Sequence, residues 1–219
     1  MLLAEQLASY IRSHPDFQIV TEMDGQYGHM GATLTDAVLQ AGVKYDSVVR
    51  PRVQRLRRDF PRAHTTSAFQ QLLRERGAAA VLQWSGGRKL ETLAVLTELL
   101  RSEEVETEED FRAWIRRPGN LARLREIKGI KDKTAHYIEI LLGIQSVAVD
   151  RHLFRFLDEA GLPATNYEEA HILIRDAAAV LGVDASLLDH SIWRYMSTRA
   201  VPRSGLPEPR TPDCRQTPA

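Results

Sequence analysis

The sequence predicts an all-α fold, and three observations lead to that prediction. Apolar residues recur at the three- and four-residue spacing of an amphipathic helix along most of the 219-residue chain, as at Leu90, Leu93, Leu96 and Leu100. Residues that cap helix N-termini stand directly before several of these segments. Clusters of glycine, proline and serine divide the pattern into about ten helices of ordinary length.

Capping residues and breaks define the predicted helices in chain order. Thr66 or Ser67 begins a helix over AFQQLLRER. Thr107 begins the next over EEDFRAWIRR, with Asp110 completing a capping box, and Asn166 begins one over YEEAHILIRDAAAVL. The breaks fall at residues 25–31, 85–87, 118–119, 161–163 and 182. Residues 202–219 are rich in proline and poor in apolar side chains, which predicts a disordered tail.

The composition limits the class of protein. The sequence has no apolar run of about 18 residues, and its first residues do not have the charge spacing of a signal peptide. We therefore expect a cytoplasmic protein, nucleoid-associated if bacterial, with no membrane partner. The single cysteine, Cys214, excludes an internal disulfide, a four-cysteine zinc site and a four-cysteine iron–sulfur cluster.

The charged residues are distributed unevenly. The chain carries 29 basic and 29 acidic residues, and a net charge of zero by itself argues against a polyanionic partner. Residues 103–110 are nearly all acidic, whereas the basic segment, residues 44–62, contains only two acidic residues. The basic side chains of this segment are candidate phosphate contacts: Lys44, Arg50, Arg52, Arg55, Arg57, Arg58 and Arg62.

A tight turn between two helices is predicted within Leu124 to Ile138, LREIKGIKDKTAHYI. The turn lies at Gly129, and the second helix begins at Lys131 or Asp132. Such a turn exposes backbone N–H groups at a helix N-terminus, where they bind phosphate oxygens. The pattern resembles the helix-hairpin-helix motif, which holds the DNA backbone without reading sequence. The alternative is an ordinary helical hairpin within an all-α core.

The residues after this hairpin make the resemblance more specific. An apolar run ends in Asp150 and opens another helix, within GIQSVAVDRHLFRFL. A hairpin with a lysine in KTA, followed by V-D-x-H and an apolar helix, resembles the catalytic core of the endonuclease III and 8-oxoguanine glycosylase superfamily. Lys131 stands where that family usually has a second glycine, so it either adds a phosphate contact or distorts the turn. The iron–sulfur cysteines of endonuclease III have no counterpart, which makes the chain similar to cluster-free members.

This resemblance implies a fold and an activity. The fold would have two helical lobes with a DNA-binding cleft between them. The activity would be that of a monomeric DNA glycosylase and AP lyase that excises a damaged base from duplex DNA without a required cofactor. Lys133 would be the nucleophile that forms a Schiff base, and Asp150 would stabilise the cationic transition state. The missing cluster favours 8-oxoguanine slightly over oxidised pyrimidines as the base.

Further residues are assigned to this site. The DNA-binding candidates are Gly129, Ile130, Lys131, Lys128, Arg88 and Lys89. The candidates for a base pocket or an intercalating wedge are Gln26, Tyr27, His29, Gln40, Tyr45 and His152. As in family members, the hairpin is expected to accommodate a structural Na, K, Mg or Ca ion on the backbone carbonyls of Arg125, Ile127 and Ile130.

The resemblance also suggests how the chain is divided. Residues 1–31 and 145–201 would form one lobe, and residues 32–144 the other, with the helix-hairpin-helix at about residues 121–140. Two alternatives to a bifunctional enzyme stay open. The protein is either a non-catalytic helix-hairpin-helix module that binds DNA or scaffolds a repair complex, or a monofunctional glycosylase in which Lys133 is incidental.

Overall fold

The computed structural model describes residues 2–199. This part of the chain forms twelve α-helices and one short π-helical segment and contains no β-strand, so the predicted all-α fold is confirmed. None of its helices is both long and apolar enough to cross a membrane. The predicted tail, residues 202–219, and Cys214 lie outside the described residues.

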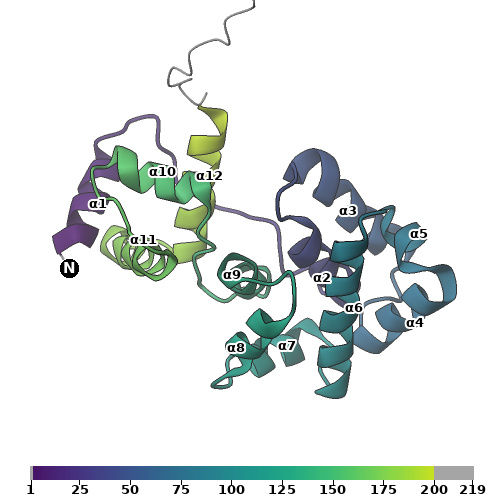
Figure 1. Ribbon diagram of the computed structural model, residues 1–219. Helices are drawn as coiled ribbons and strands as arrows, with labels where there is room; N and C mark the ends of the chain where they lie inside the picture. The colour runs from purple at the N-terminus through teal and green to yellow at the C-terminus, as the bar shows by residue number, and fades with distance from the viewer. Residues whose placement is uncertain (1, 200–219) are drawn as a thin grey trace, which may run out of the picture.

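The helices form two groups that lie next to each other (Figure 1). One group contains both ends of the described chain and consists of α1 (Leu2–Arg12), α10 (Arg151–Glu159), α11 (Tyr167–Leu181) and α12 (Ala185–Thr198). The other is continuous in sequence and consists of α2 (Met30–Leu39), η1 (Tyr45–Val49), α3 (Arg50–Asp59), α4 (Thr66–Arg76), α5 (Ala78–Leu82), α6 (Gly87–Ser102), α7 (Glu108–Ile115), α8 (Asn120–Glu126) and α9 (Asp132–Leu141).

Each group has its own hydrophobic core. The larger core gathers buried side chains from α2 to α9, among them Phe69, Phe111 and Trp114. The smaller core joins α1 to the three C-terminal helices through residues such as Leu7 and Phe156. Burial of these apolar surfaces is the main stabilising contribution to a domain of this size. Met30 and the adjoining Tyr27 belong to the larger core. The division of the chain into lobes 1–31 with 145–201 and 32–144 stays a prediction.

Two of the predicted helix starts are confirmed at their capping residues. Thr107 and Asp110 form the expected capping box before α7, in which each side chain accepts a hydrogen bond from the other residue's backbone. Asn166 caps α11, since its side-chain oxygen accepts the N–H of Glu169 at 3.0 Å. These local bonds satisfy donors that have no partner within the helix.

The start of α4 differs from its prediction by one residue. The capping side chain is Thr65, which accepts the N–H of Ala68, rather than Thr66 or Ser67. Thr66 is fully buried and its hydroxyl donates to the carbonyl oxygen of Val105 at 2.6 Å. Sequence spacing alone does not distinguish adjacent hydroxyl residues, because the choice depends on this contact with a distant segment.

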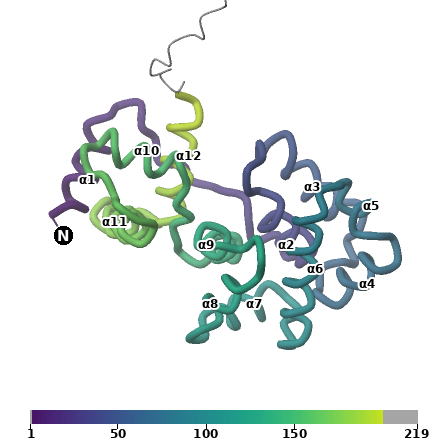
Figure 2. The backbone as a smooth tube through the Cα atoms, in the orientation of Figure 1, coloured from purple at the N-terminus to yellow at the C-terminus, as the bar shows by residue number. Residues whose placement is uncertain are grey.

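The linker between α1 and α2, residues 13–29, connects the two groups of helices (Figure 2). It is fixed to both of them by backbone hydrogen bonds. The N–H of Val20 donates to the Ser191 hydroxyl of α12 at 2.9 Å. The N–H of Gln26 donates to the carbonyl oxygen of Leu141, at the end of α9, at 2.7 Å.

Helix α9 contacts both groups and lies between them (Figure 1). Its apolar face, with Ala135 and Ile138, is buried in the larger core. Its other face carries His136, whose ring lies 4.3 Å from the ring of His171 in α11. The His136 Nδ1 is 2.8 Å from a carboxylate oxygen of Glu139. The second helix of the hairpin therefore belongs to the interface between the lobes.

Candidate active site

The hairpin turn connects α8 to α9 and requires glycine at position 129. Gly129 has a φ of +101°, which side-chain-bearing residues rarely adopt. A Cβ at this position would also overlap the Thr92 hydroxyl of α6. That hydroxyl lies 2.8 Å from the carbonyl oxygen of Lys128 and so fixes the turn against α6.

The residue in place of the second family glycine causes no strain. Lys131 is the N-cap of α9 and has extended backbone angles, φ −120° and ψ −176°, which any residue adopts. Its side chain is exposed, as is that of Lys128. Because the first intrahelical bond runs from Ala135 N to Lys131 O, the N–H groups of residues 132–134 are directed out of the helix end. This is the arrangement that binds a phosphate oxygen.

Ile130 has a different part in the hairpin from the one expected. Its side chain is fully buried, and its N–H donates to the carbonyl oxygen of Ile127 at 2.9 Å, closing the turn. The donor predicted for phosphate is therefore already used within the protein. Ile130 anchors the hairpin in the core instead.

Lys133 and Asp150 meet in space although they are 17 positions apart in the sequence. The Lys133 Nζ is 3.5 Å from Asp150 Oδ2. Lys133 lies in the first turn of α9, and Asp150 is the N-cap of α10. The other carboxylate oxygen, Oδ1, accepts the N–H of His152 at 2.8 Å, which fixes the orientation of the carboxylate. One side chain thus caps a helix and faces an amine.

The segment that carries Asp150 is held by two side chains of α12. Asp189 accepts the N–H of Ala148 at 2.5 Å, and Ser186 accepts the N–H of Ser146 at 3.0 Å. Burial raises the pKa of the Asp189 carboxyl to about 7. Sequence reasoning missed both residues. Their i, i+3 spacing on a helix was the available signal, but it does not identify which segment they contact.

Gln40 completes the surroundings of the amine. It follows the last residue of α2, is 9% exposed, and its Oε1 accepts a hydrogen bond from Lys133 Nζ at 3.2 Å. Two other pocket candidates, Tyr27 and Tyr45, lie outside α2 and donate to the buried carboxylate of Asp36, one turn before Gln40, at 2.6 and 2.9 Å. Asp36 was missed by sequence reasoning, although it is the one charged residue of α2.

Two predicted pocket residues have structural contacts instead. His29 is the N-cap of α2: its Nδ1 accepts the N–H of Ala32 at 3.1 Å, and its Nε2 lies 3.0 Å from the carbonyl oxygen of Phe60. Burial lowers the pKa of His29, consistent with a neutral ring in this role. His152 contacts Asp150 through its backbone, and its ring packs edge-on against Trp193 with 6.4 Å between centroids.

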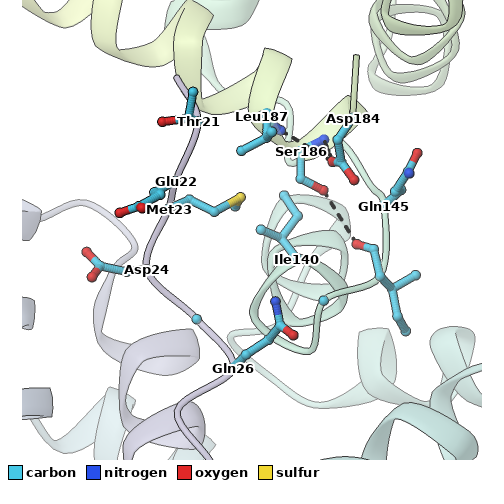
Figure 3. A pocket seen from close by; sticks show the side chains of 13 residues that line it. Thr21, Glu22, Met23, Asp24, Gln26, Ile140, Gln145, Asp184, Ser186 and Leu187 are labelled. Atoms are coloured by element: carbon cyan, nitrogen blue, oxygen red, sulfur yellow. Dashed lines mark hydrogen bonds between the residues drawn. The ribbon is translucent and has the colours of Figure 1, made fainter. Parts of the chain in front are cut away.

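The remaining pocket candidate, Gln26, lies at the other end of α9 from Lys133. It lines a groove of about 400 Å³ formed by the linker, the end of α9 and the start of α12 (Figure 3). Ile140 and Ser186 line the same groove, whereas Lys133 and Asp150 do not. The cavity and the amine–carboxylate pair are therefore separate features of the molecule.

The predicted phosphate contacts of α6 differ from each other. The side chain of Arg88 is exposed. The ammonium of Lys89 instead donates to the carbonyl oxygens of Leu39 and Ala41, at 2.5 and 2.7 Å. Burial lowers the pKa of Lys89. Lys89 thus stabilises the C-terminal end of α2 on both sides of Gln40, and this role replaces the phosphate contact we predicted.

Much of the basic segment is also engaged within the protein. The Arg52 guanidinium donates to carbonyl oxygens at the end of α5 and to that of Val48. Arg55 donates to carbonyl oxygens of α5 as well. Arg50 pairs with two carboxylates, those of Asp24 and Asp46. These donors are occupied, so we do not expect Arg52 and Arg55 to contact phosphate.

Within residues 2–199, no group of three histidine, cysteine or acidic side chains is placed to hold a metal ion. The proposed hairpin ion would instead use backbone carbonyls, those of Arg125, Ile127 and Ile130. The Ile127 carbonyl already accepts one hydrogen bond, and a carbonyl oxygen has a second lone pair for a cation. The hairpin ion therefore stays a proposal.

Comparisons with known proteins give a family and a fold. A family model described as "Domain of unknown function (DUF8548)" matches residues 5–197. No curated protein matches the chain significantly. A solved structure described as "Structure of a Trapped Endonuclease III-DNA Covalent Intermediate: Estranged-Adenine Complex" is similar, with a TM-score of 0.57 and 17% sequence identity over 92% of this chain and 88% of that chain. The predicted endonuclease III-like fold is thereby confirmed.

Proposed function

The chain belongs to the family of domain of unknown function DUF8548, and we propose that it is a DNA glycosylase with an associated AP-lyase activity. The observation that carries this proposal is the approach of the Lys133 amine to the Asp150 carboxylate, 3.5 Å apart, beside a hairpin suited to DNA. The similar solved structure is itself a covalent complex of endonuclease III with DNA. That description supports DNA as the substrate class, and we propose damaged duplex DNA as the substrate.

The proposed reaction uses the two side chains in different roles. The lone pair of the Lys133 amine attacks C1′ of the deoxyribose, and the bond between C1′ and the base breaks, so that the base leaves with the electron pair. Opening of the sugar ring gives a Schiff base, and loss of a C2′ proton then expels the 3′ phosphate. The Asp150 carboxylate stabilises the positive charge that develops on the sugar. The hairpin N–H groups hold the DNA backbone.

An oxidised base is the proposed leaving group. We expect 8-oxoguanine to be a better substrate than oxidised pyrimidines. A panel of duplexes, each with one lesion, measures this preference directly. A monomeric protein without a required cofactor is part of the same proposal.

Borohydride trapping tests the mechanism. Reduction of the Schiff base during turnover should cross-link wild-type protein to the lesion duplex, and the product survives denaturing electrophoresis. Lys133→Gln should abolish the cross-link while retaining affinity for the duplex. Asp150→Asn should lower excision by at least about 100-fold with the fold intact, since the amide still accepts a capping bond.

Lys131→Gln is the matched control, because Lys131 is exposed and lies two residues before Lys133. This variant should still form the cross-link when the protein is in saturating excess over the duplex. Excision by wild-type protein without any cross-link would favour a monofunctional glycosylase. Binding without excision of any lesion would favour a non-catalytic module. Trapping by Lys133→Gln would assign the nucleophile to another lysine.

A further inference from the structure

Gln40 occupies an unusually constrained position beside the Lys133 amine. Its backbone N–H donates to the carbonyl oxygen of Asp36 at 3.1 Å. The carbonyl groups on either side of it, those of Leu39 and Ala41, both accept hydrogen bonds from the half-buried ammonium of Lys89. The fold thus fixes the backbone of Gln40, and with it the start of a side chain that reaches Lys133.

The carboxamide of Gln40 is only half satisfied. Its Oε1 accepts from Lys133 Nζ at 3.2 Å, whereas its Nε2 is buried and has no hydrogen-bond partner among residues 2–199. A buried donor without a partner destabilises the folded state, because it has lost its hydrogen bond to water. Such groups are rare enough in folded proteins to require an explanation.

The two acceptors around Lys133 Nζ match the donors of a neutral amine. Gln40 Oε1 and Asp150 Oδ2 accept two N–H bonds. A neutral amine has two N–H groups and one lone pair, so the third tetrahedral direction is left for the lone pair. A nucleophile held in this way has a defined direction of attack, which is a large part of the advantage of an oriented reactant.

The Gln40 side chain is uncharged, which distinguishes it from a glutamate at the same position. A glutamate would supply the same acceptor and leave no buried donor unpaired. It would also place a second carboxylate at the amine and favour the ammonium form, which has no lone pair. Glutamine is the side chain of this length that accepts a hydrogen bond without that charge. The unpaired Nε2 of Gln40 is therefore the consequence of needing an acceptor without a negative charge.

We propose that Gln40 is a positioning residue that orients the Lys133 amine for attack and, being uncharged, allows it to lose its proton. The proposal rests on the proposed function, because it assigns a role toward the nucleophile of that reaction. It makes two separable statements. The acceptor oxygen controls the rate of attack, and the absence of charge controls its pH dependence.

Single-turnover borohydride trapping on a preformed abasic duplex, from pH 5.5 to 9, tests both statements without requiring base excision. Gln40→Met keeps the length but removes the acceptor, and trapping at the plateau should fall at least about tenfold. Gln40→Glu keeps the acceptor and adds a charge, so the midpoint of the profile should move up by about one to three pH units. Thermal unfolding of both variants shows whether the fold is retained.

A Gln40→Met plateau equal to wild type, or a Gln40→Glu profile with an unmoved midpoint, would overturn the proposal while the glycosylase function stands. If wild-type protein forms no cross-link at any pH, the proposed function itself has failed. In that case the role of Gln40 is tested by the rate at which an acylating reagent modifies Lys133 in wild type, Gln40→Met and Gln40→Glu, measured by peptide mass spectrometry. Lys131 is the internal reference. If Lys133 of Gln40→Glu is acylated as fast as Lys133 of wild type below pH 9, the proposal for Gln40 is overturned.

Discussion

Two buried carboxylates near the candidate active site differ in how their burial is compensated. Asp36 accepts hydrogen bonds from three tyrosine hydroxyls, those of Tyr27, Tyr45 and Tyr137. Burial raises the pKa of Asp36 to about 6, and these bonds oppose the effect. Asp189 has one backbone donor, the N–H of Ala148, and burial raises its pKa to about 7. Ionisation of Asp189 at neutral pH therefore lowers the free energy of unfolding.

Asp189→Asn should change the pH dependence of stability. The folded-state pKa of Asp189, about 7, lies above its unfolded value of 3.8, so the folded protein binds the extra proton. The resulting stability is fully present below pH 3.8 and is lost as the pH rises through about 7, at up to roughly 1.4 kcal/mol per pH unit. Asparagine keeps an acceptor for Ala148 without this loss. The variant should be more stable than wild type at pH 8 and similar at pH 4.

Urea unfolding at pH 4, 6 and 8 measures this difference. Asp158→Asn, which removes an exposed carboxylate of α10, reports the effect of one surface charge. Parallel pH curves for wild type and Asp189→Asn would contradict the prediction.

At the scale of secondary structure, the hairpin is the element that the sequence describes most completely. Gly129→Ala should lower the free energy of unfolding by about 1–3 kcal/mol, because a Cβ both disfavours a φ of +101° and overlaps Thr92. Binding to damaged and undamaged duplex should weaken equally, since the hairpin contacts only the DNA backbone. Urea unfolding and fluorescence anisotropy measure the two effects.

Gly119→Ala is the matched control for the hairpin. Gly119 also has a positive φ, +88°, but a Cβ there meets no atom within 4 Å. The difference between the two variants isolates the overlap with Thr92. Loss of affinity confined to damaged DNA in Gly129→Ala would contradict a role in backbone binding.

The elements that were predictable are those specified by neighbours in the chain. A glycine turn, a lysine in the first helical turn and an aspartate before an apolar helix are local features, and the family resemblance they carry identified Lys133 and Asp150 as a candidate pair. The capping box of Thr107 and Asp110 was predictable for the same reason. All of these interactions span four residues or fewer, apart from the pairing of the two candidates, which came from family spacing.

The elements that were not predictable depend on partners far away in the sequence. Gln40 and Lys133 are 93 residues apart, and their contact follows from the packing of α2 against α9. Lys89 has the composition of a phosphate ligand, but it stabilises the end of α2. Arg52 similarly donates to carbonyl oxygens 30 or 31 residues away. A sequence shows which positions carry a lysine or an arginine, but not whether that side chain already donates its hydrogen bonds to carbonyl oxygens of the protein.

At the scale of the whole molecule, the candidate active site lies where the two lobes meet. Lys133 comes from α9, which belongs to the larger group and contacts the smaller one, and Asp150 caps the first of the three C-terminal helices. The linker crosses between the lobes at the opposite end of α9, where it lines the groove of Figure 3. Movement of one lobe relative to the other would therefore alter the distance between the amine and the carboxylate.

The distribution of free and engaged cations over the molecule changes the expected source of DNA affinity. The net charge is zero, and several arginines of the basic segment are engaged with carbonyl and carboxylate groups of the protein. The exposed hairpin lysines, Lys128 and Lys131, are then the better candidates for phosphate contacts. Each phosphate neutralised by a cation contributes about −0.9 to the slope of log affinity against log salt.

Lys128→Gln and Lys131→Gln should each make that slope shallower by about 0.9 while leaving the melting temperature nearly unchanged. Arg52→Gln should instead change the melting temperature and not the slope. It leaves carbonyl oxygens at the end of α5 without their donor, so it should lower the melting temperature and leave the slope of the residual affinity as in wild type. Binding titrations between 50 and 200 mM salt, roughly the range over which counterion release is resolved, measure the slopes. A shallower slope for Arg52→Gln with unchanged stability would return the basic segment to the DNA interface, because the slope counts the phosphates that cations of the protein neutralise.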